Sequence, residues 1–325
     1  MSLPPDLLAR MTGLRILVVG DLVLDEYLIG RVSRLSREAP VPVLEQTRVQ
    51  YVPGGAANPA VNIRSLGAQA VMAGLLGKDD AAVRLQELLA DRGVDLAGVI
   101  IDPSRPTTHK VRLVAEGAYV FAHHLARVDR LSRTPVTGDR ERRLCDRIDA
   151  ILPQVDAVLI SDYRLGVVTP AVVEAVRRAA RSRGILTTVD TQGNLAAFHG
   201  FDVLRCNAGE AMSYLGRELA EDEAYEAALR EIMGTLEARS VIITRGAEGV
   251  SGVDEAGVVF HLPASNRTQV FDVTGAGDVF IAVVTLMRTL GVDLQTAAAL
   301  GNRAAGVAVT RLGNVAVQPR DLNLW

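Results

Sequence analysis

Cysteine is nearly absent from this sequence, which has only Cys145 and Cys206. The two lie too far apart for a CxxC motif, which argues against a disulfide framework and against a cysteine-based metal or redox site. The five histidines also lack the HExxH or HxxxH spacing of a zinc site. We therefore expect no transition-metal centre.

An excess of either charge is missing as well, since 35 Lys and Arg face 38 Asp and Glu, a net charge of -3. Such a balance gives no long-range attraction to nucleic acid or to an anionic membrane. The mostly apolar run 279–287 is about half of the ~20 residues of a membrane helix, and the N-terminus lacks the features of a signal peptide. We expect a cytoplasmic protein with no nucleic-acid or membrane partner.

What the sequence does have is enough apolar residues for a large core: 325 residues, of which 49% are hydrophobic. Short β-branched runs such as "LRILVVGD", "DAVLISD", "ILTTVD" and "SVIITRG" alternate with helical stretches such as "TPAVVEAVRRAARSRG". This alternation predicts an α/β fold with a doubly wound, mostly parallel sheet flanked by helices. We expect one domain over residues 1–325.

Two segments differ from this pattern and predict a small β-sheet lid. Residues 26–51 mix prolines and arginines with alternating valines, and residues 106–128 hold two alternating runs separated by Glu116 and Gly117, a hairpin signal. An exposed β edge favours pairing with another chain. We therefore expect a homodimer that forms through the lid.

Polar residues directly follow five of the predicted strands. In an open parallel sheet, ligands bind outside the carboxyl ends of the strands, so we expect these residues to line one edge. They are Gly20 and Asp21, Ser161 and Asp162, Asp190, Asn207, and the run Thr244, Arg245 and Gly246.

The stretch "DVTGAGDVF" combines a flexible turn with a carboxylate at the start of an apolar helix. Gly275 and Gly277 permit backbone angles that direct N-H groups at an anion, and the helix dipole adds to that attraction. Asp278 then has two possible roles: a helix-dipole partner that contributes about 0.3 to 1 kcal/mol, or a general base beside a bound phosphate. A metal-binding loop is the third interpretation. These residues alone do not distinguish the three interpretations.

Four other stretches each allow a binding role and a purely structural one. "GDLVLDEY" and "GGAANPAVN" hold carboxylates and amides that suit sugar hydroxyls, but they also suit a turn and a capped helix. "NAGE" suits Mg²⁺ held through water or a solvated helix start, and "TRGAEG" suits a loop at a strand end or a tight β-turn. No GxxxxGK[ST] occurs and no GxGxxG follows the first strand, which argues against a P-loop NTPase or a dinucleotide-binding oxidoreductase.

The order of these motifs along essentially the whole chain resembles the PfkB, or ribokinase-like, family of carbohydrate kinases, with "DVTGAGDVF" as the most diagnostic segment. The resemblance implies a ribokinase-like fold and transfer of the γ-phosphoryl of ATP to a sugar, with Mg²⁺. It implies a catalytic base at Asp278 and an anion hole at Gly275, Ala276 and Gly277. Whether K⁺ assists the anion hole stays open.

The same resemblance implies further site residues. ATP would be bound by Asn207, Thr244, Gly246, Gly249 and Asn302, and Mg²⁺ by Glu210 through water. The sugar would be bound by Asp21, Asp25, Gly54, Gly55 and Asn58.

A narrower resemblance, to heptose-7-phosphate kinases, rests on "GDLVLDEYLIGRVSRLSREAPVPVLE", "SDYRLGVVTP" and "NRAAGVAVTRLG". Three places depart from that subgroup, which has a lysine at Leu165, a Pro-Lys at Thr191 and Gln192, and a glutamine pair near His123 and His124. Substitutes for the lost positive charges would be Lys110, Arg112, Arg127 and Arg164. The identity of the acceptor, a sugar or a sugar phosphate, therefore stays open.

Other functions on the same fold are a nucleoside or other small-alcohol kinase and a non-catalytic sugar-binding regulator. Intact Asp278 and both loop glycines argue against the regulator. Because the chain ends at Trp325, we also expect no nucleotidyltransferase half of the kind found in bifunctional members of the heptose kinase subgroup.

Overall fold

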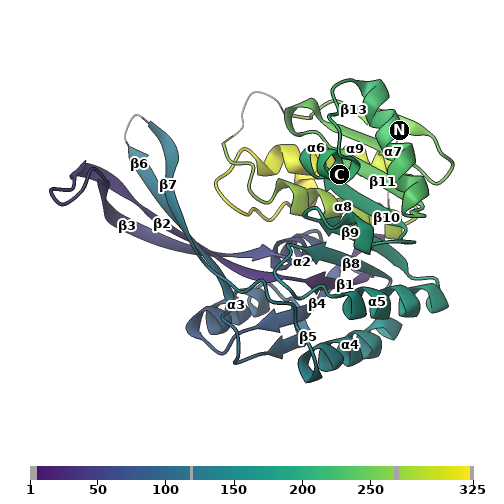
Figure 1. Cartoon of the computed structure of the whole chain (residues 1–325), viewed down its shortest axis with the longest axis horizontal. Helices are drawn as coiled ribbons and strands as arrows, with labels where there is room; N and C mark the ends of the chain where they lie inside the picture. The colour runs from purple at the N-terminus through teal and green to yellow at the C-terminus, as the bar shows by residue number, and fades with distance from the viewer. Residues whose placement is uncertain (1–5, 118–119, 267–270, 323–325) are drawn as a thin grey trace.

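The computed structural model describes residues 6–117, 120–266 and 271–322, which form two sheets and the helices around them. A nine-stranded sheet lies at the centre, and a four-stranded sheet extends away from it (Figure 1). The sequence-based prediction of a doubly wound α/β fold with a second, smaller sheet is confirmed. No helix within the described ranges is long and apolar enough to cross a membrane.

The large sheet has the strand order β13-β12-β11-β10-β9-β8-β1-β4-β5. Its seven parallel strands are β1 (Arg15–Gly20), β4 (Gln69–Leu76), β5 (Asp95–Ile101), β8 (Ala157–Asp162), β9 (Leu186–Thr191), β10 (Val203–Asn207) and β11 (Ser240–Thr244). The antiparallel edge consists of β12 (Val250–Val253) and β13 (Val259–Leu262). Neither edge strand was predicted from the sequence, because both are short and lack a long apolar run.

Both faces of the large sheet are covered by helices. In β1, Ile16 and Val18 pack into one core and Leu17 and Val19 into the other, and all four are fully buried. The first core includes α2 (Ala57–Ser65), α3 (Asp80–Ala90), α8 (Ala276–Thr289) and α9 (Leu294–Ala308), with α1 (Leu7–Thr12) at its edge. The second includes α4 (Asp139–Ile151), α5 (Pro170–Arg183), α6 (Ala208–Leu215) and α7 (Asp222–Thr235). Burial on both faces explains why these strands are continuously apolar in sequence.

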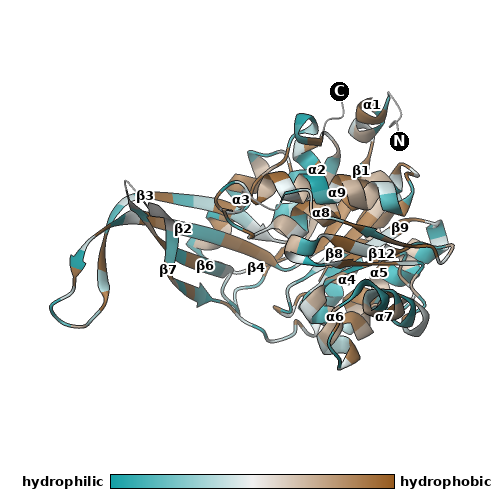
Figure 2. Ribbon diagram, turned by 90° about the horizontal axis from the view of Figure 1, so that it is seen from above, coloured by the Kyte–Doolittle hydropathy of each residue, from teal (hydrophilic) through white to brown (hydrophobic). Residues whose placement is uncertain are grey.

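The smaller sheet forms a long ribbon that projects beyond the helices (Figure 2). Its order is β3-β2-β6-β7, from β3 (Pro42–Gly55), β2 (Leu22–Leu35), β6 (Thr108–Gly117) and β7 (Val120–Arg130). The strands are longer than the predicted 26–51 segment, and the β2 and β6 pair is parallel, so the sheet is mixed. β6 and β7 pair antiparallel as a hairpin, but Glu116 and Gly117, the predicted turn, are the last residues of β6, and β7 begins at Val120.

The base of the ribbon meets the carboxyl edge of the large sheet. β2 is buried in its first half and exposed at its far end. Asp25 of β2 pairs in register with Lys110 of β6 and with Val52 of β3. The polar residues of the ribbon base therefore lie close to the strand ends where a ligand is expected.

Candidate active site

The N-terminus of α8 is shaped by two glycines. Gly275 adopts a left-handed backbone conformation with φ 75°, and no described side chain caps the helix there. A Cβ on Gly275 would lie 2.4 Å from Asn314 Oδ1, and one on Gly277 would lie 2.8 Å from Nη1 of Arg205. The left-handed conformation and close packing therefore favour glycine at position 275, whereas a side chain at position 277 would displace the guanidinium of Arg205.

Asp272, the other carboxylate of this stretch, orders the loop. It accepts hydrogen bonds from the backbone N-H groups of Thr274 and Gly313, both at 2.9 Å. Although burial alone would raise the pKa of Asp272, the hydrogen bonds from Thr274 and Gly313 outweigh it and lower the pKa. The two carboxylates of "DVTGAGD" therefore have different environments.

Asp278 is buried in the first turn of α8, with a relative exposure of 3%. Its carboxylate accepts hydrogen bonds from Nδ2 of Asn58 at 2.8 Å and from the hydroxyl of Tyr163 at 2.7 Å. Burial, followed by the negative charge of Asp190, raises the pKa of Asp278 to about 7, while the two hydrogen bonds and Arg205 act in the opposite direction. A carboxylate with a pKa near neutrality suits a general base.

The amide of Asn58 is oriented by Asn62, one turn later on α2. Asn62 donates from Nδ2 to Asn58 Oδ1 at 3.0 Å, and its own Oδ1 accepts from the N-H of Val317 at 3.0 Å. The NH₂ group of Asn58 is thus turned toward Asp278. The structure gives Asn58, a predicted sugar-binding residue, a direct contact with the carboxylate of Asp278.

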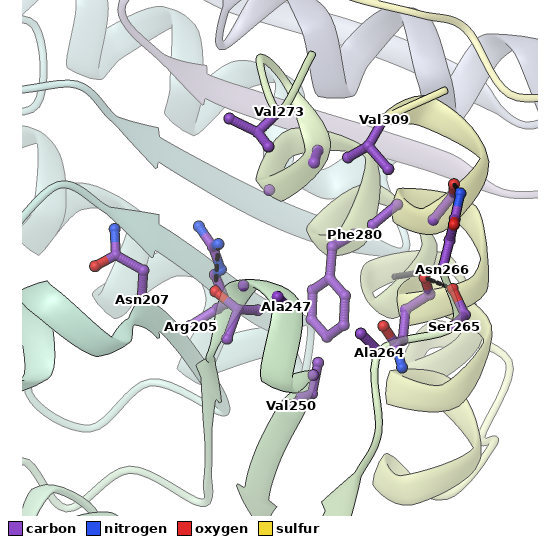
Figure 3. Close-up of a pocket in the computed structure, with 18 residues that line it drawn as sticks. Arg205, Asn207, Ala247, Val250, Ala264, Ser265, Asn266, Val273, Phe280 and Val309 are labelled. Atoms are coloured by element: carbon purple, nitrogen blue, oxygen red, sulfur yellow. Dashed lines mark hydrogen bonds between the residues drawn. The ribbon is translucent and has the colours of Figure 1, made fainter. Parts of the chain in front are cut away.

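A cavity of about 420 Å³ opens beside the start of α8 (Figure 3). It is lined by all five residues predicted to bind ATP: Asn207, Thr244, Gly246, Gly249 and Asn302. Ala276 and Gly277 also line it, and apolar side chains, including Val250, Phe280 and Val309, form much of its wall. An apolar cavity of this size with a few polar groups at a helix N-terminus fits a nucleotide.

Arg205 of β10 is a lining residue that the sequence analysis missed. Its Nη1 donates to Asp190 at 2.7 Å and its Nη2 to Thr244 Oγ1 at 2.6 Å. Its Nε is buried without a hydrogen-bond partner in the part of the chain that the structure describes. The signal was an arginine inside the apolar strand "VLRCN", because a buried arginine needs a partner or a ligand.

Arg245, which follows β11, does not share this position. Its guanidinium pairs with Asp222 at 2.5 Å and with Glu248 at 3.1 Å, and it lies 4.2 Å from the ring centroid of Tyr225. Arg245 does not line the 420 Å³ cavity. Among the arginines that the structure describes, Arg205 is therefore the one that lines the predicted nucleotide cavity.

Asn207 and Glu210 cap α6. Asn207 Oδ1 accepts from the N-H of Glu210 at 2.9 Å, and Glu210 Oε2 accepts from the N-H of Asn207 at 2.7 Å. This reciprocal pair is a capping box. The helix-start alternative is thus present in the structure, and Glu210 as a Mg²⁺ ligand stays a prediction.

The side chains around the cavity can be compared with the ligands that Mg²⁺ requires. Across residues 6–117, 120–266 and 271–322, no group of three or more His, Cys, Asp and Glu could hold a metal ion. Kinase sites, however, usually hold Mg²⁺ through one or two carboxylates, waters and substrate phosphates. Glu210, whose capping partner Asn207 lines the cavity, fits this mode, and burial raises its pKa.

The polar residues at the ribbon base form the opposite side of the site. Asp25 Oδ1 accepts from Arg112 at 2.5 Å and Oδ2 from Asn314 Nδ2 at 2.7 Å. A Cβ on Gly54 would lie 2.1 Å from Asp25 Oδ2, so glycine is needed there. The Nζ of Lys110 lies 5.5 Å from the ring centroid of Tyr163, and burial lowers the pKa of Lys110.

Asp21 is buried and holds a loop. Its carboxylate accepts from the backbone N-H groups of Tyr163 at 2.9 Å and of Leu165 and Val167, both at 3.1 Å. Burial raises the pKa of Asp21 to about 6 against the opposing effect of these bonds. Gly55 packs against its carbonyl with φ 55°. Sugar binding by Asp21 and Gly55 stays a prediction, and the visible role of the carboxylate is support of the loop.

Phosphoryl transfer requires mainly a held nucleotide, charge stabilisation and one base. The cavity, Arg205 and Asp278 are the groups that would meet these three requirements in a small-molecule kinase. Comparison with protein families agrees with this class. Residues 14–320 match the model of the pfkB family carbohydrate kinases, so the chain belongs to that family.

Two relatives illustrate the similarity in sequence. The bifunctional protein HldE of Geobacter sulfurreducens is 38% identical over 317 residues, which are 97% of this chain and 64% of the relative. The bifunctional protein HldE of Nitrobacter hamburgensis is 39% identical over 309 residues, covering 94% of this chain and 62% of the relative. The chain thus spans less than two thirds of the length of these relatives.

Solved structures show the same fold. Phosphofructokinase-2 from Escherichia coli, in complex with substrates and products, matches with a TM-score of 0.77 and 21% identity, over 95% of this chain and 97% of that one. Ribokinase from Arabidopsis thaliana, complexed with ribose and ATP, matches with a TM-score of 0.74 and 20% identity, over 96% and 98%. At this level of identity the likeness concerns the fold.

Proposed function

We propose that the protein transfers the γ-phosphoryl group of ATP to a hydroxyl of a phosphorylated sugar, with heptose 7-phosphate as the first candidate acceptor. The observation that carries this proposal is the position of Asp278. Its buried carboxylate starts α8 between the predicted nucleotide cavity and the ribbon base, and burial brings its pKa to about 7. The ATP donor would place the reaction in the cytoplasm.

Asp278 would accept the proton of the sugar hydroxyl as that oxygen attacks the γ-phosphorus. The new oxygen-phosphorus bond forms as the bond to the bridging oxygen of ADP breaks, and the electron pair leaves with ADP. Arg205 and the N-H groups at the start of α8 would stabilise the charge on the transferred group. Mg²⁺, when bound, would neutralise phosphate charge, with Glu210 and Asn207 as its nearest predicted protein partners.

Four basic residues could replace the lost positive charges on the acceptor side. Arg112 is paired with Asp25 and Arg127 with Asp129, whereas Lys110 and the exposed Arg164 make no ion pair among the described residues. Leu165, which stands where the heptose kinases have lysine, is buried with its backbone N-H bound by Asp21. We infer that Lys110, beside Tyr163 and Asp25, binds the acceptor's phosphate in place of the lost lysines.

An acceptor screen tests this function. ADP release is measured with heptose 7-phosphate, the unphosphorylated heptose, fructose 6-phosphate, ribose and nucleosides. We expect a phosphorylated sugar to be preferred, and Lys110→Ala to raise KM about 10-fold or more for that acceptor only, since a charge-assisted contact is worth about 1.5 to 3 kcal/mol. Lys78→Ala, an exposed lysine outside the site, is the control.

Two outcomes would contradict the proposal. Preference for nucleosides would make the protein a nucleoside kinase, and no turnover with any acceptor would favour a sugar-binding regulator. Equal KM changes for phosphorylated and unphosphorylated acceptors in Lys110→Ala would remove Lys110 from the phosphate site.

We also propose that the ribbon acts as a lid over the acceptor and pairs with a second ribbon in a homodimer. Exposed apolar side chains support the pairing because such groups are normally buried at an interface. On the ribbon they are Val32, Leu35, Val41, Val49, Leu125 and Val128. Sedimentation of the wild type and of a Leu35→Glu, Val128→Glu double variant tests this, and a monomeric wild type would contradict it.

A further inference from the structure

The loop 163–167 after β8 is held from several sides. Besides the three N-H bonds to Asp21, the carbonyl of Leu165 accepts from Arg105 at 2.6 Å. The carbonyl of Gly166 accepts from the N-H of Val136 at 2.8 Å, and Gly166 has φ 89°. Few backbone positions in this loop are left free to move.

This fixed loop presents the side chain of Tyr163 to the base. The hydroxyl of Tyr163 donates to Asp278 Oδ1, and Asn58 donates to Asp278 Oδ2. Within the part of the chain that the structure describes, each carboxylate oxygen therefore has one donor, and the two donors come from different elements, α2 and the loop after β8. Two donors at fixed positions hold the plane of the carboxylate and leave its remaining lone pairs for the acceptor hydroxyl.

We propose that Tyr163 is a positioning residue that fixes Asp278 for proton abstraction, and that Asp21 acts through the 163–167 loop to hold Tyr163 in place. This inference rests on the proposed role of Asp278 as the general base. It assigns a function to a hydroxyl that the sequence analysis did not select, and it gives Asp21 a role that requires no contact with the sugar.

Tyr163 acts as a hydrogen-bond donor and not as a proton carrier. Burial, followed by the negative charge of Asp278, raises the pKa of Tyr163 well above its usual value, so the phenol stays protonated at the pH of the reaction. Lys110 lies over the other face of the ring. The ring thus links the predicted phosphate-binding lysine to the base.

Loss of the Tyr163 hydroxyl is expected to raise the pKa of Asp278. The charged and titratable groups that face Asp278 and Tyr163 are Asp190 on β9, Arg205 on β10, Asp25 on β2 and Lys110 on β6. Of the interactions on Asp278, the bond from Tyr163 lowers its pKa, so Tyr163→Phe raises it. A base with a raised pKa is protonated over a wider range, and the acidic limb of the pH-rate profile moves to higher pH.

The experiment measures kcat and kcat/KM from pH 5 to 9 for the wild type, Tyr163→Phe, Asp21→Asn and the control Tyr214→Phe. Tyr214 lies on α6, away from Asp278, and its variant should match the wild type. We expect Tyr163→Phe to shift the acidic limb upward by about 0.5 to 1 pH unit and to lower kcat about 10-fold, with little change in KM for ATP. Asp21→Asn should shift the acidic limb in the same direction by a smaller amount.

An unchanged acidic limb in Tyr163→Phe would overturn the inference even if kcat falls, because a purely structural defect lowers the rate without moving the limb. Folding of each variant is checked by circular dichroism, and Asp21→Asn supplies a second test if Tyr163→Phe does not fold. Asp278→Asn separates the positioning role from the proposed function. If Asp278→Asn keeps its activity, the proposed function fails; if it is inactive and Tyr163→Phe is normal, only the positioning role fails.

Discussion

Two helices at the carboxyl edge of the large sheet begin with nearly the same sequence and have different N-termini. α6 starts at Asn207-Ala208-Gly209-Glu210 and α8 at Gly275-Ala276-Gly277-Asp278. At α6 the cap and the acid bond each other's backbone N-H groups. At α8 no described side chain caps the helix, and the acid bonds to Asn58 and Tyr163 instead.

The difference shows what makes a helix start available to a ligand. An asparagine N-cap and a glutamate long enough to fold back satisfy N-H groups of α6 internally. A left-handed glycine N-cap and a shorter aspartate do not do so at α8, where Ala276 and Gly277 border the cavity. The N-H of Ala276 donates instead to the carbonyl of Val273 at 3.3 Å. The same acid position is therefore a helix cap in α6 and a candidate base in α8.

The matched glycines give the largest expected contrast between the two helix starts. Gly277→Ala places a Cβ 2.8 Å from Arg205, whereas the nearest atom to a Cβ on Gly209 is Asn207 Oδ1 at 3.4 Å. We expect Gly277→Ala to lower kcat/KM for ATP about 100-fold, since lost charge stabilisation typically costs 10²- to 10³-fold. Gly209→Ala should stay within about 3-fold. Equal losses in steady-state assays would contradict the proposed division of roles.

Glu210 gives a smaller and sharper contrast, because its helix cap and its predicted metal role can be separated. Glu210→Gln keeps a group that can accept from the N-H of Asn207, but it removes the charge. We expect the Mg²⁺ concentration for half-maximal rate to rise about 10-fold, with thermal stability nearly unchanged. If the Mg²⁺ dependence matches the wild type, Glu210 is a helix cap alone.

The last contrast concerns the dependence of stability on pH. Burial raises the pKa of Asp278 from 3.8 to about 7, so between these values the native state binds more protons than the unfolded state. The free energy of unfolding therefore falls as the pH rises from about 4 to 7, by at most about 1.4 kcal/mol per pH unit. Asp278→Asn removes this penalty, so its gain in thermal stability should be larger at pH 8 than at pH 5. Equal gains would show that the carboxylate is not destabilised by burial.

Much of the site could be predicted because polar residues at strand ends meet at one edge. Asn207 and Thr244 end the parallel strands β10 and β11, and Gly246 follows β11. These three residues line one cavity with Gly249 and Asn302. The central strands were predictable for a related reason, since burial on both faces gives continuous apolar runs. The edge strands β12 and β13 gave no such signal.

The contacts that orient Asp278 could not be predicted in the same way. Asn58 and Tyr163 are 220 and 115 residues from Asp278 in sequence, and only the packing of α2 and the loop after β8 against α8 brings them together. Asp21 was predicted to bind sugar because a carboxylate suits hydroxyls. A carboxylate suits backbone N-H groups equally well, and the fold supplies three of them.

The central claim is that Asp278 is the general base of the reaction, and that its burial in the fold brings its pKa close to 7. The most direct test measures turnover and ATP binding of Asp278→Asn in one preparation, with the acceptor selected by the screen. We predict that kcat falls at least about 1,000-fold while the dissociation constant for ATP stays within about 3-fold of wild type. A variant that retains near wild-type turnover would contradict the account.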